Sequence, residues 1–89
     1  MRSMESKRFV AVVNRYYERL VWEHDSLEEA LREDQSEEHF FIGAFDRQTM
    51  TAWLPEITAI GYSKDKALRD LTEAIGQTPQ TVKMFKVSD

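Results

Sequence analysis

The chain has no cysteine, three glycines and two prolines among its 89 residues. The absence of cysteine excludes disulfide bridges, cysteine-ligated zinc and thiol nucleophiles. The scarcity of glycine excludes a phosphate-cradling loop, because Gly43 and Gly61 are isolated along the chain. Long apolar runs are also missing: residues 9–13 are far too few to cross a bilayer. We therefore expect a cytoplasmic protein with no membrane contact and no cofactor.

The residues that are present suit a small folded domain whose charge is unevenly distributed. Hydrophobic residues make up 42% of the chain and charged residues 31%, and 89 residues bury one core. We predict a single domain over residues 1–89, with residues 1–7 as a flexible lead-in. The net charge of −4 conceals an acidic block: residues 23–38 carry eight acids against Arg32 alone. Such a block repels phosphate and suits a basic protein partner.

A repeated motif organises the chain. The pattern Ser-x-x-x-Ala-Leu-Arg-acid occurs at residues 26–33 and again at residues 63–70. Ser26 and Ser63 are typical helix N-caps, and Gly76 is typical of the residue that ends a helix. Each copy therefore predicts a helix that follows an apolar, strand-prone stretch.

The apolar stretches predict strands. Residues 40–45 and 50–54 flank a polar turn and predict a hairpin, and residues 81–87 predict a final strand. Residues 9–22 are ambiguous, because their apolar spacing fits a helix while their β-branched and aromatic content fits a hairpin. The repeat favours the hairpin but leaves the helix open.

These expectations combine into an α+β fold of order β-β-α-β-β-α-β. We predict an antiparallel β-sheet with two helices on one face, built from units 8–36 and 39–76 and closed by the final strand. An internal duplication would account for the repeated motif.

No residue pattern indicates an enzyme. His24 and His39 lack a metal-ligand spacing, and adjacent carboxylates such as Glu28 and Glu29 point to different faces of a helix. Both motif serines are explained as caps, since neither lies in a nucleophile elbow. We therefore expect no catalytic residue and no metal.

The sequence instead favours a protein-binding module of the inhibitor or antitoxin-like kind, an accessory protein of bacterial or phage origin. The acidic block would attract a basic partner, and exposed aromatics would anchor it. Ten residues are candidates for partner binding: Glu28, Glu29, Glu33, Asp34, Glu37, Glu38, Tyr16, Tyr17, Trp22 and Trp53.

Two alternatives remain open. Sheet aromatics and arginines, with Arg15, Arg19 and Arg47 beside Tyr16 and Tyr17, would stack on single-stranded nucleic acid, although the acidic net charge makes nucleic acid an unlikely partner. Apolar residues on both strand faces would instead suit a homodimer that binds a small ligand.

Residues 50–75 resemble HicB-type antitoxins. The matching residues are Trp53-Leu54-Pro55-Glu56, Gly61, Ser63, Ala67-Leu68 and Glu73-Ala74-Ile75. The resemblance covers under a third of the chain, and the link from Pro55 to Ser63 is shorter than is usual in that family. It implies a toxin-binding fold.

Overall fold

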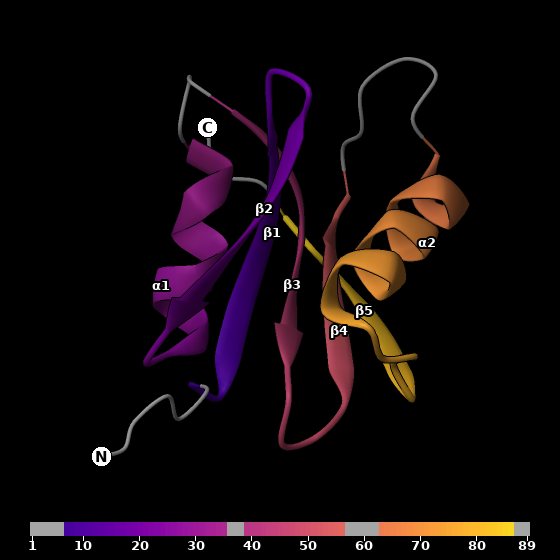
Figure 1. The fold of residues 1–89 in the computed structure, drawn as a ribbon. Helices are drawn as coiled ribbons and strands as arrows, with labels where there is room; N and C mark the ends of the chain where they lie inside the picture. The colour runs from indigo at the N-terminus through magenta and orange to yellow at the C-terminus, as the bar shows by residue number, and fades with distance from the viewer. Residues whose placement is uncertain (1–6, 36–38, 57–62, 87–89) are drawn as a thin grey trace.

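The computed structural model describes residues 7–35, 39–56 and 63–86. Its elements form a small α+β fold, in which a five-stranded sheet lies between two helices (Figure 1). They run in the order β1 (Phe9–Arg15), β2 (Glu18–His24), α1 (Leu27–Leu31), a 3-10 turn η1 (Arg32–Gln35), β3 (Phe40–Asp46), β4 (Thr51–Pro55), α2 (Lys64–Ile75) and β5 (Thr81–Phe85). Within the described ranges, no helix has the length and apolar character needed to cross a bilayer.

The sheet is mixed, so the prediction of an antiparallel sheet is wrong for its last strand. Its order is β2-β1-β3-β4-β5, with antiparallel pairs up to β4 and a parallel pair between β4 and β5. The physical reason is the intervening helix: α2 carries the chain back along the sheet, so β5 starts at the same end as β4.

The helices lie on opposite faces of the sheet, which corrects the prediction that they share one face. Val10 and Val12 pack in the cluster under α2, whereas Ala11 and Val13 pack in the cluster under α1. Right-handed crossovers explain this arrangement. The two crossover connections are β2–α1–β3 and β4–α2–β5, and both lead in the same direction across the sheet. However, β2 and β3 run antiparallel to β4 and β5. The same hand therefore places α1 and α2 on different sides.

Residues 9–22 fall in the hairpin of β1 and β2, which settles the ambiguity against a helix. The strands pair through seven residue positions, and the turn consists of Tyr16 and Tyr17. The run Val10–Val13 is fully buried because helices cover both faces of β1. A strand buried on both faces is apolar at consecutive positions and not only at alternate ones. The apolar spacing of residues 9–13 therefore does not distinguish a strand from a helix.

A bulge in β3 keeps both faces apolar. Val12 pairs with Gly43 and Val13 pairs with Phe41, so Ile42 is the extra residue. Glycine is required next to it, since a Cβ on Gly43 would lie 2.9 Å from both the Leu54 side chain and the Trp53 carbonyl oxygen.

Both predicted helix caps are present. The Ser26 hydroxyl oxygen accepts a hydrogen bond from the Glu29 amide at 3.2 Å, and Ser63 does the same for Lys66 at 3.2 Å. Gly76 ends α2 with φ of 73°. The helices differ in length, with five residues in α1 and twelve in α2. This difference and their opposite faces mean that the duplication is not confirmed. Most of the expected lead-in and the last residue of the expected strand 81–87 lie outside the described residues.

Candidate functional site: an aromatic hairpin turn

The turn between β1 and β2 presents two tyrosines to solvent. Arg15 and Glu18 are the last paired residues of the strands, and Tyr16 and Tyr17 connect them. Tyr16 is 86% exposed and Tyr17 is fully exposed. Tyrosine has a large apolar ring that usually finds a partially buried environment. Two such rings at one turn form an exposed aromatic site.

Tyr16 adopts a backbone conformation that normally belongs to glycine. Its φ is 59°, in the left-handed region, while Tyr17 has an ordinary negative φ. A two-residue hairpin turn with positive φ at its first position strongly favours glycine there. A non-glycine residue in this region costs roughly 1–2 kcal/mol. The positive φ of Tyr16 therefore lowers the stability of the fold.

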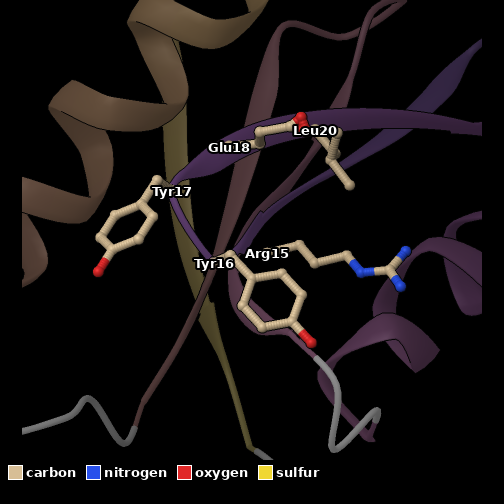
Figure 2. A pocket seen from close by; sticks show the side chains of 5 residues that line it. All are labelled: Arg15, Tyr16, Tyr17, Glu18 and Leu20. Carbon is tan, nitrogen blue, oxygen red and sulfur yellow. The ribbon is translucent and has the colours of Figure 1, made fainter.

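The turn also forms the wall of an open hollow of about 480 Å³. In Figure 2, Tyr16, Arg15 and Leu20 extend to one side of the hairpin and Tyr17 extends to the other. Leu20 also packs against the cluster under α1, which ties the hollow to the core. The hollow is lined by Arg15, Tyr16, Tyr17, Glu18 and Leu20.

This combination of groups suits the recognition of another protein. Tyrosine and arginine are enriched among the residues that dominate interface energies. Tyrosine buries a large ring with only two side-chain torsions to order, so its entropic cost on binding is low. Glu18 adds an anionic group beside the cationic Arg15. The site therefore combines apolar side chains with one cationic and one anionic group.

The acidic candidates are only partly assembled on a surface. Glu28 and Glu29 are exposed on α1, and Arg32 lies 3.6 Å from Glu28. Glu33 instead faces inward: its carboxylate oxygens lie 2.9 Å from His24 Nε2 and 3.8 Å from His39 Nε2. The Asp34 side chain, Glu37 and Glu38 lie outside the description.

The two tryptophans pack in the core cluster beneath α1, unlike the tyrosines. Trp22 lies against His39, with ring centroids 4.7 Å apart. Trp53 is covered by the Lys83 ammonium group, 5.2 Å from its ring centroid. Both are partly buried, so their rings contribute mainly to the fold.

The arginines proposed for nucleic-acid binding do not all come together, because Arg15 and Arg19 lie near the β1–β2 turn whereas Arg47 follows β3. Arg19 lies 3.5 Å from Asp70 and 3.4 Å from Glu73, both on α2. Arg47 lies at the opposite end of the sheet, 2.9 Å from Glu23. Among the described residues, most sheet aromatics pack in the two core clusters beneath the helices, so they form no open stacking platform.

The cluster of His24, Glu33 and His39 was not predicted, because the three residues are distant in the sequence. His39 is almost entirely buried, with 5% of its side chain exposed. Across residues 7–35, 39–56 and 63–86, no group of three or more histidines and acids is arranged to hold a metal ion. The short distances from Glu33 to both imidazoles place η1 beside β2 and the start of β3.

The opposite turn, between β3 and β4, contains a second unpredicted feature. Arg8 donates two hydrogen bonds to the buried Asp46 carboxylate, each 2.8 Å long. The Gln48 and Thr49 amides donate to the same carboxylate at 2.9 Å and 3.4 Å. The Arg8 hydrogen bonds, helped by the two amides, lower the pKa of Asp46 to about 2 despite its burial. Its partners satisfy Asp46 fully, so we assign it a structural role.

The sequence prediction included Tyr16 and Tyr17, which lie in this turn, but it did not include Glu18 and Leu20, which line the same hollow. The available signal was a pair of tyrosines between two strand-like runs with no glycine or asparagine at the turn.

Comparison with protein-family models, with curated proteins and with solved structures finds no match for this chain, so the resemblance to HicB-type antitoxins gains no support from a family match.

Proposed function

We propose that this chain is a small acidic protein-binding module that inserts its β1–β2 turn into a partner protein. One observation carries the proposal: Tyr16 and Tyr17 are exposed at a turn where Tyr16 is held at positive φ. Backbone strain at an exposed position persists only where the surrounding structure enforces it, and it gathers at functional sites.

The hairpin that carries the turn is well supported by the core. Val10 to Val13 of β1 are completely buried, and Leu20 and Trp22 of β2 pack under α1. Arg19 fastens β2 to α2 through Asp70 and Glu73. Because the strands are held in place, binding would order little beyond the two tyrosine side chains.

The charge of the chain points to a basic partner. Exposed Glu28 and Glu29 would accelerate the encounter, and the tyrosines would determine how long the complex lasts. We place this interaction in the cytoplasm, with the chain acting as an inhibitor or antitoxin-like accessory protein. A partner with an apolar cleft rimmed by lysines or arginines would complement the turn.

Site-specific photo-crosslinking in lysate of the native cell tests this proposal. A photoreactive phenylalanine analogue would replace Tyr17, and a matched control would carry it at Gln48, an exposed residue of the opposite turn. We expect one basic protein to be crosslinked in high yield from position 17 and not from position 48. Equal crosslinking from both positions would contradict a specific role for the tyrosine turn.

Affinity measurements with the crosslinked protein would then show how much each residue of the turn contributes to the binding free energy. Tyr16→Ala and Tyr17→Ala should each weaken binding about 30-fold, as expected for residues worth about 2 kcal/mol in an interface. Glu28→Gln with Glu29→Gln should lower the association rate and its salt dependence while leaving dissociation unchanged. If the chain bound a labelled oligonucleotide and no protein from the lysate, the proposal would be overturned in favour of nucleic-acid binding.

A further inference from the structure

Strand β5 forms one outer edge of the sheet and leaves backbone groups available for pairing. The Thr81 amide donates to the Met50 carbonyl, and the Phe85 carbonyl accepts from the Glu56 amide. Backbone groups of alternate residues point to opposite sides of a strand. Thr81, Lys83 and Phe85 therefore face β4, while Val82 and Met84 direct their N–H and C=O groups away from the sheet.

The side chains of the same two residues are exposed. Val82 is 40% and Met84 is 37% exposed, beside the buried Ala52 and Leu54 of β4. A strand added next to β5 would extend this apolar row on the α2 side. Neither Val82 nor Met84 makes a hydrogen bond outside the β4 ladder within the described ranges.

The other outer edge of the sheet is protected by charge. On β2, Arg19 is held by Asp70 and Glu73, and Glu23 is held by Arg47. Charged residues along an edge prevent another strand from pairing with it. β5 has one charged residue within the strand, Lys83, which lies between the exposed apolar residues Val82 and Met84.

We propose that the β5 edge binds an extended segment of a partner protein by β-strand addition, and that this segment places an acidic residue opposite Lys83. Lys83 lies on the α1 side of β5 with its ammonium group over the Trp53 ring of β4, and its flexible side chain can turn outward to a carboxylate on the added strand. Apolar residues on either side of the acid would cover Val82 and Met84. Backbone hydrogen bonds supply affinity in this binding mode, and alternate side chains supply specificity.

Charge also argues against a second copy of the chain as the occupant. Antiparallel pairing of two β5 strands that matches Val82 with Met84 of the other copy places the two Lys83 side chains directly opposite each other. Like charges at directly opposed positions destabilise a sheet. This surface is separate from the tyrosine turn, so the proposal stands or falls independently of the function proposed above.

A peptide titration followed by NMR tests the strand addition on the full chain. The probe is the capped peptide Thr-Thr-Val-Glu-Val-Thr-Thr, and two controls replace its glutamate with lysine or methylate the amide nitrogens of both valines. We expect the glutamate peptide to shift the Val82 and Met84 amide signals and to bind about 10-fold more tightly than the lysine peptide. The methylated peptide should not bind, because it lacks the required donors.

Variants of the chain provide the reciprocal test. Lys83→Glu should reverse the preference, so that the lysine peptide binds more tightly than the glutamate peptide. Met84→Pro removes an outward amide without breaking the β4 ladder and should abolish binding, whereas Met84→Thr keeps that amide and should retain it. The methylated peptide on the unaltered chain gives the same information if the proline variant does not fold.

Three results would overturn the proposal. The first is no shift at Val82 and Met84 with millimolar glutamate peptide, and the second is equal affinity for the glutamate and lysine peptides. The third is concentration-dependent dimerisation in light scattering that Met84→Pro abolishes, because the occupant would then be a second copy of the chain.

Discussion

The two hairpin turns of this protein share one backbone feature, but they differ in the packing, hydrogen bonds and solvent exposure around it. Each contains a non-glycine residue at positive φ: Tyr16 at 59° in the β1–β2 turn and Met50 at 58° in the β3–β4 turn. Met50 is partly buried against the core, and its carbonyl oxygen accepts hydrogen bonds from the Gln80 and Thr81 amides. Tyr16 extends into solvent.

The difference separates a turn whose backbone strain is offset by packing and hydrogen bonds from a turn whose strained residue is exposed. At the β3–β4 turn, packing of Met50 and the hydrogen bonds to Asp46 offset the unfavourable backbone conformation. At the β1–β2 turn, the side chains of Tyr16 and Tyr17 form no hydrogen bond or ion pair with the described part of the chain. Folding alone therefore gives no reason for a tyrosine at position 16.

The largest expected effect on stability comes from breaking the β3–β4 turn. Asp46→Asn removes the charge that Arg8 and two amides stabilise, and we expect the free energy of unfolding to fall by about 2 kcal/mol, because Arg8 is partly exposed and stays solvated. Urea denaturation measures this change. The control is Asp25→Asn, which removes an exposed partner of Lys7 and should cost less than about 0.5 kcal/mol. Similar losses for the two variants would contradict the structural role of Asp46.

The same carboxylate makes stability depend on acid pH. The folded pKa of Asp46 is about 2, below the ordinary value near 3.9, so its contribution to stability is complete above about pH 5 and is lost progressively as the pH falls towards 2. We expect a loss of about 2 kcal/mol across this range. Unfolding curves at several pH values, compared with those of Asp46→Asn, isolate the effect. Parallel pH profiles for the two proteins would show that Asp46 does not cause it.

The smallest effects on stability should have opposite signs in the two turns. Tyr16→Gly relieves the positive φ without loss of packing, and should raise the free energy of unfolding by about 1 kcal/mol. Met50→Gly also relieves strain but removes a partly buried side chain, and should lower stability by about 1 kcal/mol. Thermal unfolding of both variants checks the signs. A loss of stability in Tyr16→Gly would mean that the tyrosine supports the fold.

The sequence predicts local structure better than it predicts long-range arrangement. Ser26, Ser63 and Gly76 act as helix caps because capping depends on residues within one turn. The parallel β5 and the opposite helix faces depend on strand order, which no local pattern encodes. Likewise, the pairing of Arg8 with Asp46 joins residues 38 positions apart.

The candidate site was predictable in its residue types but not in its exposure. Tyr16 and Trp22 both lie in one aromatic-rich stretch, yet the tyrosine is exposed and the tryptophan is partly buried. The reason is their place in the hairpin: Trp22 pairs with Ala11 under α1, whereas Tyr16 lies beyond the last strand pair. Exposure thus follows from register, and register is set by the position of the turn.

The most direct test of the binding role measures stability and affinity on the same variant. Tyr16→Gly combined with Tyr17→Ser keeps the turn geometry and removes both rings. The binding role predicts unfolding at equal or higher denaturant concentration, together with affinity about 1000-fold weaker for the protein crosslinked from position 17. Unchanged affinity, or a loss of affinity only in step with a loss of stability, would contradict it.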